Sequence, residues 1–419
     1  MGLFHASRGN GIACCERDEK EMTPRPFPKA KKINGTRILL RVDWNVPISK
    51  RGPEDSLKLE RTMPFLQELS KRGAKIILLT HLGRPKKREA ALSTKRFLPL
   101  LKERYEIEPI YHKESVGSAR DRAKLLKQIG ASEPGSIHLL ENVRFDVGEE
   151  KGTKVLAKAY AELGDLYVNN AFAACHRAHV SVAVLPKLFQ SEAFAGPQLI
   201  EEVKELSKLL DKPKRPFIAV IGGKKLSTKI PVLKKLFSLC DAVLIGGAMA
   251  SPFLEAAGYK VGASYSDASA KADAKRLLKK RNLFLPGDVM VMKKGSRMHK
   301  LEATSVGQIG STQSIRDVGP ATLAAWGALL GRAKTILWNG PIGITEQKAS
   351  GFGSRFIARV IGAHAKGPAL GIAGGGDTIP VIQDTQTLEW FDFVSTGGGA
   401  ILEFIEKDGK LPGLIALKR

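Results

Sequence analysis

Short apolar runs rich in β-forming residues alternate along this sequence with longer amphipathic stretches, and this alternation constrains the fold most. The runs are residues 38–40, 76–79, 137–140, 166–168, 217–220, 242–245 and 335–338. They show no polar alternation, which is typical of strands buried on both faces of a parallel sheet. Stretches between them, such as 62–71 and 154–163, carry apolar residues at helical spacing. The pattern predicts doubly wound α/β layers.

The length of 419 residues predicts two domains, because a single core rarely grows that large. Residues 197–210 are predicted to form one helix, with a leucine and valine stripe and Pro197 in the first turn, where a missing N–H costs nothing. A Lys- and Pro-rich loop follows. We therefore expect a first domain up to residue 195, a hinge helix and linker over 196–215, and a second domain from 216.

The composition is that of a cytoplasmic protein without a membrane anchor. It is 43% hydrophobic and 26% charged, and no apolar run approaches the length that spans a bilayer. The four cysteines have neither metal-ligand spacing nor a disulfide framework, which favours a reducing compartment. Charged residues interrupt the start of the chain, so we interpret 1–21 as a disordered extension rather than a signal peptide.

The formal net charge is +25, which attracts polyanions such as nucleic acid or phosphorylated metabolites. The basic residues are scattered along helical stretches and are not interleaved with aromatic residues, which make up only 6% of the chain. This distribution favours a solvated basic surface. Nucleic-acid binding is not expected, but it stays open as an alternative.

Polar and cationic side chains follow the predicted strands of the first half. They are Asp43, Asn45, His81, Arg84, Arg144, Asn169, His176, Arg177 and His179. Ligands of open α/β sheets bind at the carboxyl ends of the strands. Guanidinium groups converging there suit a small molecule that carries phosphate and carboxylate, since arginine bonds both in a bidentate manner.

Glycines follow the strands of the second half. They occur at 222–223, 246–247, 340, 374–376 and 397–399. Glycine lets backbone N–H groups approach phosphate oxygens closely, especially at a helix N-terminus. Asp377 within such a turn can hold Mg²⁺ beside phosphates. The P-loop, the dinucleotide fingerprint and the protein-kinase motifs are all missing from the sequence, so a nucleotide site here is of another kind.

Ten motifs, in this order, resemble phosphoglycerate kinase from about residue 32 to residue 419. They are RVDWNVP (41–47), THLGRPK (80–86), LLENVRF (139–145), YVNNAFAACHRAH (167–179), GGKKLSTKI (222–230), LIGGAMA (244–250), DVGP (317–320), ILWNGPIG (336–343), GGGDT (374–378) and VSTGGGA (394–400). The resemblance implies two Rossmann-like domains and reversible phosphoryl transfer from 1,3-bisphosphoglycerate to Mg-ADP, giving 3-phosphoglycerate and ATP. It also implies a glycolytic monomer whose segment 396–419 returns to the first domain.

The resemblance assigns roles residue by residue. In the domain 22–195, the positions that match the 3-phosphoglycerate site are Asp43, Asn45, Lys58, His81, Arg84, Arg144, His176 and Arg177. In the domain 216–395, the positions that match the nucleotide site are Lys225, Lys229, Gly246, Gly247, Asn339, Glu346, Gly375, Gly376, Asp377 and Thr378. Lys58, Lys225, Gly376 and Gly399 are the expected catalytic positions, and Asp377 is the expected link to Mg²⁺.

Three positions depart from the family pattern. Lys58 stands where the family usually carries a catalytic arginine, and Arg61 is interpreted as a solvated arginine one helical turn on. Asn170 replaces a common aspartate, for which we expect a change in structural hydrogen bonding only. Ala248 replaces a frequent glycine and is expected to narrow the adenine pocket by one methyl group.

The reaction implied needs no general base, because both nucleophiles are ionised at neutral pH. Cations from both domains must instead neutralise the transferring group and exclude water, which requires hinge closure. Two rival interpretations remain at this stage. A dinucleotide-dependent enzyme shares the α/β pattern, and a basic nucleic-acid-binding protein on this fold, with lost or weakened catalysis, explains the charge.

Overall fold

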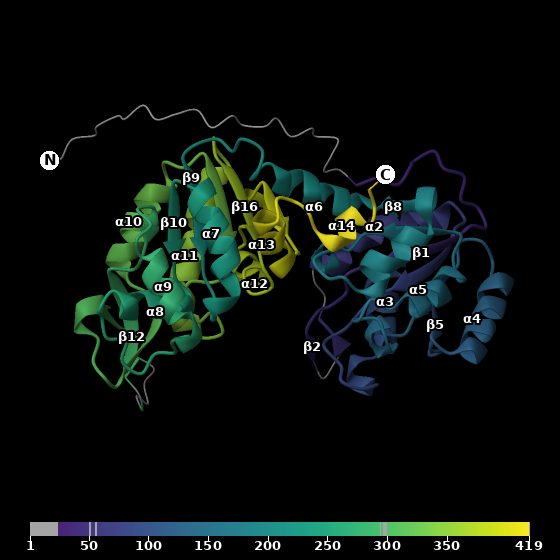
Figure 1. Ribbon diagram of the computed structural model, residues 1–419, viewed down its shortest axis with the longest axis horizontal. Coiled ribbons are helices and arrows are strands. Elements are labelled where there is room, and N and C mark those ends of the chain that lie inside the picture. Colours follow the sequence, from purple (N-terminus) through teal and green to yellow (C-terminus); the bar gives the residue numbers. More distant parts are fainter. Residues whose placement is uncertain (1–23, 50–51, 55–56, 294, 296–299, 419) are drawn as a thin grey trace.

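The protein consists of two α/β lobes, with the helix α6 (Pro197–Ser207) between them (Figure 1). The computed structural model describes residues 24–418, except 50–51, 55–56, 294 and 296–299. The extension expected at 1–21 lies outside the described residues. All seven predicted apolar runs form strands.

The first lobe is built on a parallel sheet of six strands in the order β5-β6-β4-β1-β7-β8. The strands are β1 (Arg37–Arg41), β4 (Lys75–Leu79), β5 (Ile110–His112), β6 (Ile137–Leu140), β7 (Leu166–Asn169) and β8 (Ala193–Ala195). Successive residues of a strand point to opposite faces, so Leu39 and Leu40 enter different core layers. One layer packs on α2 (Leu57–Lys71) and α3 (Leu98–Tyr105), and the other on α4 (Ala119–Ala131), α5 (Lys154–Ala161) and α6.

The second lobe repeats this plan with the strand order β11-β10-β9-β15-β16-β17, again all parallel. Its strands are β9 (Phe217–Ile221), β10 (Ala242–Ile245), β11 (Leu283–Phe284), β15 (Thr335–Asn339), β16 (Leu370–Gly374) and β17 (Phe393–Ser395). One face carries α7 (Ile230–Leu239), α8 (Ser251–Ala256), α9 (Lys271–Leu277) and α13 (Gly399–Glu406). The other carries α10 (Pro320–Leu330), α11 (Phe352–Ala365) and α12 (Ile379–Asp384). The predicted class, two doubly wound domains joined by a hinge helix, is confirmed.

Smaller strands complete the fold. An antiparallel sheet of β12 (Asp288–Lys293), β13 (Glu302–Ser305) and β14 (Gln313–Val318) extends the second lobe. A short hairpin joins β2 (Ile48–Ser49) and β3 (Gly52–Pro53) in the first lobe. The antiparallel sheet was not predicted, because its strands are only half-buried and lack the long apolar runs of the parallel sheets.

The two lobes share core residues where they meet. Apolar side chains of α5, α6, α7 and α13 belong to one continuous cluster, and Leu57 of α2 packs into the core of the second lobe. The chain ends on the first lobe (Figure 1), where α14 (Pro412–Ile415) lies against residues 180–184. There the Gly413 N–H donates to the carbonyl of Cys175 at 2.9 Å.

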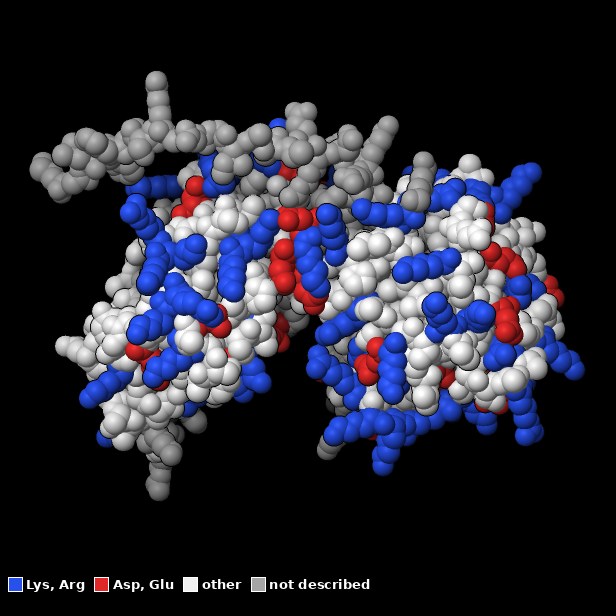
Figure 2. Space-filling view, viewed as in Figure 1, with Lys and Arg blue, Asp and Glu red and all other residues white. Residues whose placement is uncertain are grey.

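The surface is strongly basic. Lysine and arginine side chains spread over both lobes on the face shown in Figure 2, and this face is hollowed between the lobes. Within the described part of the chain, no helix has the length and apolarity that a membrane crossing requires.

Candidate active site

The carboxyl ends of β1 and β4 are tied together at the centre of the first sheet. The Trp44 N–H donates to the hydroxyl of Thr80 at 3.1 Å, and the Gly83 N–H donates to the side-chain oxygen of Asn45 at 2.8 Å. These bonds fix the two loops against each other. Asp43 and Asn45, which follow β1, and His81, which follows β4, therefore lie in one site.

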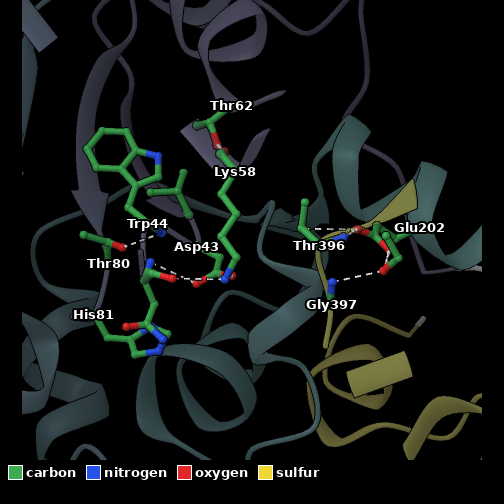
Figure 3. Close-up of polar contacts among 12 residues, drawn as sticks. Asp43, Trp44, Lys58, Thr62, Thr80, His81, Glu202, Thr396 and Gly397 are labelled. Carbon is green, nitrogen blue, oxygen red and sulfur yellow. Dashed lines mark hydrogen bonds and ion pairs between the residues drawn. The ribbon is translucent and has the colours of Figure 1, made fainter. Parts of the chain in front are cut away.

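Lys58 reaches this site from α2 and pairs with Asp43 (Figure 3). Its Nζ lies 2.6 Å from Oδ2 of Asp43 and donates to the carbonyl of Asn45 at 3.1 Å. Burial acts to raise the pKa of Asp43, but the charge and hydrogen bond of Lys58, together with the charge of Arg41, outweigh it and the pKa lies below its usual value. The carboxylate is thus ionised and holds the ammonium at the carboxyl ends of β1 and β4.

A buried layer that the sequence analysis missed supports this face. The guanidinium of Arg41 lies 2.9 Å from Nδ1 of His81 and donates to the hydroxyl of Ser181 at 3.0 Å. Ser181 in turn donates to the buried carboxylate of Glu149 at 2.6 Å. Burial, together with the charge of Arg41, lowers the pKa of His81 well below its usual value, so this imidazole is neutral. Arg41 stands in the RVDWNVP motif, which is the signal that could have identified it.

The remaining predicted residues of the first domain form a cationic group. Burial lowers the pKa of Arg144 despite its ion pair with Glu150, and the charges of Arg41, Arg177 and Arg84 lower it further. His179 lies among the same cations, and its pKa falls to about 4, chiefly through burial. His176 also has a lowered pKa, again mainly through burial. Mutually repelling guanidinium groups at one strand edge predict an anionic ligand.

The second domain has a cavity of about 360 Å³ where β9 and β15 end. The order of the strands reverses between these two neighbours, which is the usual ligand position in such sheets. Eight of the predicted residues line it: Lys225, Lys229, Asn339, Gly375, Gly376, Asp377, Thr378 and Gly399. Gly398, from the predicted glycine run 397–399, also lines the cavity, and so do Lys224, Glu403 and Glu406, which were not predicted as site residues.

Two glycine loops leave this cavity open to a ligand. A Cβ atom added at Gly376 or at Gly399 would meet nothing within 4 Å. Gly375 has a φ of +126°, a conformation that side chains strongly disfavour, and a Cβ there would lie 3.0 Å from the hydroxyl of Thr378. The backbone N–H groups of such turns suit phosphate oxygens.

Lys229 is fixed beneath these loops. Its Nζ donates to the carbonyl of Gly222 at 2.7 Å and to the side-chain oxygen of Asn339 at 3.1 Å. Burial lowers the pKa of Lys229 to about 8, although the charge of Asp377 acts to raise it. An anionic ligand in the cavity would restore the preference for the charged ammonium.

A larger cavity of about 650 Å³ adjoins the first and shares Gly223, Lys224, Pro341 and Asp377 with it. Gly247, Ala248 and Glu346 line the larger cavity. Gly246 is not among the lining residues, and an added Cβ there would come within 2.6 Å of Ile342. The assignment of Gly246 to the nucleotide site stays a prediction.

Asp317, in the DVGP motif, was missed as a site residue although it lines the larger cavity. Its carboxylate accepts from the N–H groups of Val318 and Gly353, both at 2.8 Å. Burial raises its pKa to about 7 despite these bonds. Asp317 therefore joins β14 to α11 and shapes the wall of the cavity.

The hinge helix contacts both sites. Asn170 accepts from the Gln198 N–H at the start of α6 at 2.9 Å, so its contact is structural, as expected. Further along α6, the buried carboxylate of Glu202 accepts from the Ser395 hydroxyl at 2.5 Å and from the Thr396 N–H at 3.1 Å (Figure 3). One helix thus links the first domain to the glycine loop that follows β17.

Arg61 is not a solvated arginine, contrary to the prediction from the sequence. Its guanidinium donates to the carbonyl of Val394 at 2.8 Å and lies 5.3 Å from the centre of the Phe393 ring. The interpretation was wrong because a partner 333 positions away in the sequence leaves no local pattern. Arg61 points across the lobe boundary to Val394, whereas Lys58 points to Asp43.

The fold and site define a phosphotransferase of two α/β domains, with a cationic face on one domain and a glycine-rich nucleotide cavity on the other. Comparisons with known proteins identify it further. The family model described as phosphoglycerate kinase matches residues 29–408, and the chain belongs to this family. A phosphoglycerate kinase of Methylorubrum populi is 38% identical over 402 residues, covering 94% of this chain and 98% of the relative.

Solved structures agree with this assignment. The structure of phosphoglycerate kinase from Coxiella burnetii matches with a TM-score of 0.78 and 35% identity, covering 94% of this chain and 99% of that chain. The phosphoglycerate kinase of Pyrococcus horikoshii matches with a TM-score of 0.79 and 25% identity, covering 92% and 97%. Neither a dinucleotide-dependent enzyme nor a nucleic-acid-binding protein is favoured by these comparisons.

Proposed function

We propose that this chain catalyses reversible phosphoryl transfer from 1,3-bisphosphoglycerate to Mg-ADP, giving 3-phosphoglycerate and ATP. One observation carries the proposal. Two sites suited to anions, one built from charged side chains and one from glycine loops, lie on the two lobes that α6 connects. The first-domain residues Asp43, Asn45, Lys58, His81, Arg84, Arg144, His176 and Arg177 hold the phosphoglycerate. The second-domain cavities hold the nucleotide, with its phosphates beside Lys225, Lys229 and the loop 374–378.

The residues of the chain act by positioning and by charge. The attacking oxygen is already ionised, so the enzyme must bring two anions together and stabilise the charge that spreads over the transferring group. Lys58 is held by Asp43 at the substrate face, and Lys225 approaches from the opposite domain. The backbone N–H groups of Gly376 and Gly399 add hydrogen-bond donors beside these two lysines. Neither glycine carries a side chain that would block the transfer.

Mg²⁺ accompanies the nucleotide in this proposal, and Asp377 is the residue that would hold it. Among the described residues, no group of three or more histidine, cysteine or acidic side chains forms a metal site. Mg²⁺ commonly takes one or two carboxylates together with substrate phosphates. Asp377 lines both cavities and suits that position. The ion would neutralise phosphate charge.

We also infer that the domains close about the hinge 196–215 during the reaction, since water must be excluded to prevent hydrolysis. We propose a cytoplasmic monomer. The domain limits proposed are 22–195 and 216–395. Of the segment 396–419 expected to return to the first domain, α13 packs on the second lobe, and it is α14 that lies on the first.

The test is a coupled assay with 3-phosphoglycerate, Mg-ATP and a dehydrogenase that consumes the product. Turnover that depends on both substrates is expected. Nucleotide hydrolysis that is indifferent to 3-phosphoglycerate, or no turnover at all, would contradict the proposal. The second outcome would indicate a member of the family that has lost its chemistry through the lysine at position 58.

A further inference from the structure

The larger cavity contains a cation that the proposed reaction does not use. If the phosphates occupy the smaller cavity, the sugar and base extend into the larger one, because the two share the wall at Gly223, Lys224 and Asp377. Of the described residues that line the larger cavity, Lys224 and Arg316 are the two cations. Lys224 also lines the phosphate end, whereas Arg316 lines only the far part. Arg316 therefore lies where a base would bind.

A β-bulge in β14 places Arg316 at this position. The pairing of β12 with β14 passes from Met290–Asp317 directly to Val291–Ile315, so Arg316 is the unpaired residue of a β-bulge. Bulges re-aim a side chain and are common beside active sites. The carbonyl of Arg316 accepts from the Ile344 N–H at 3.0 Å, which fixes the bulge against the segment that carries Glu346. Arg316 and the expected ribose contact are thus neighbours on one wall.

One donor of the Arg316 guanidinium is unsatisfied in the described part of the protein. Its buried Nε has no hydrogen-bond partner among the described residues. A buried donor without a partner is unusual in a native structure and calls for a ligand atom. Lys224 differs, since its ammonium lies 5.1 Å from the centre of the Tyr265 ring.

We propose that Arg316 reads the base of the nucleotide and favours a 6-oxopurine, guanine or hypoxanthine, over adenine. This inference rests on the proposed function for the identity of the site. Arginine carries only donors. A 6-oxopurine offers two adjacent acceptors, O6 and N7, which a guanidinium fork meets with two hydrogen bonds. Adenine offers N7 beside an amino group, so one donor of the fork would face another donor.

The preference can be measured in two ways. In the coupled assay, kcat/KM with GTP and with ITP is expected to exceed that with ATP by about 10-fold, the lower range for one such bidentate contact. In calorimetry, GDP and IDP should bind more tightly than ADP by the same factor. ITP is the decisive compound, because it keeps O6 and N7 but lacks the 2-amino group of guanine.

Variants identify the residue responsible. In Arg316→Leu, kcat/KM with GTP and with ITP should fall to the value with ATP. Arg316→Gln, whose amide can donate or accept, should also bring the three together if the leucine variant does not fold. Arg332→Leu, which removes an exposed arginine beyond α10, should keep the preference.

Three results would overturn the inference: a preference for ATP, a preference for GTP that ITP does not share, or an equal loss with all nucleotides in Arg316→Leu. The last would mean that the guanidinium stacks on the base without reading its edge. Failure of the proposed function is a separate result, because the calorimetric order of GDP, IDP and ADP does not depend on turnover.

Discussion

The two domains bind anions by different means. The first presents polar and charged side chains that are themselves held by charged side chains, as Lys58 is by Asp43 and His81 by Arg41. The second presents backbone loops, in which Gly376 and Gly399 leave open space where side chains would stand. A side-chain site depends on the identity of each charge, whereas a backbone site depends on the lack of a Cβ atom. The two should therefore fail under different substitutions.

Removing Lys58 should have the largest effect. Lys58→Ala takes one cation from the transferring group and leaves the buried Asp43 without its ion pair. We expect kcat to fall by roughly 100-fold, on the order of 3 kcal/mol. Lys58→Arg should stay active, because it keeps the charge and adds a bidentate fork.

The matched control is Arg61→Ala on the same helix. It should lower the melting temperature through loss of the bond to Val394 while leaving kcat much less affected. An inactive Arg61→Ala beside a nearly normal Lys58→Ala would reverse the roles given to the two residues.

Two neighbouring glycines test the backbone site. Gly375→Ala forces a side chain into a disfavoured conformation and against Thr378, so unfolding free energy should fall by about 1–3 kcal/mol. Gly376→Ala meets no neighbouring atom, so its melting temperature should stay normal while the added methyl raises KM for the nucleotide. Equal loss of stability in both variants would show that the loop is not a pre-shaped phosphate cradle.

Asp377→Ala should reduce kcat by about 10-fold, the scale for losing one electrostatic stabiliser. The reduction should depend on the Mg²⁺ concentration, which a titration of turnover with the metal measures. Asp384→Ala, an exposed carboxylate on α12, serves as the control. Normal turnover in the Asp377 variant would assign the metal to another group.

The smallest effect expected is a pH dependence where α6 meets the glycine loop. Burial raises the pKa of Glu202 from 4.5 to about 7, despite opposing bonds from Ser395 and Thr396. Between these values the folded protein binds more protons than the unfolded chain, so stability falls as pH rises. In Glu202→Gln the fall in melting temperature across this pH range should be smaller by a few degrees. A steeper decline in the variant would contradict the sign.

Much of the framework could be predicted from the sequence, because fully buried parallel strands leave apolar runs that stand out. The runs at 217–220 and 335–338 are such cases, and their carboxyl ends hold the glycine loops. The half-buried antiparallel sheet could not be predicted in this way. The same holds for β5 and β8, which are only three residues long.

The site was predicted best where chemistry repeats along the chain. Lys229, Asn339 and Thr378 were identified and do line one cavity. Arg41, Glu149 and Glu202 were missed because their importance comes from partners distant in the sequence. Glu202, for example, bonds a residue 193 positions away. The periodicity of apolar residues indicates which residues are buried, but not which buried polar groups form hydrogen bonds with one another.

The return of the chain to its first domain has a consequence for synthesis on the ribosome. Leu411, Leu414 and Leu417 are buried in the same cluster as Cys175 and Val180. A Cβ at Gly413 would come within 2.9 Å of the Cα of Cys175, so this contact is close. Domains commonly fold in order of their emergence. Here the first domain to emerge can complete this part of its core only after residues 411–418 have been synthesised. A product truncated before them would expose the apolar surface around Cys175 and Val180.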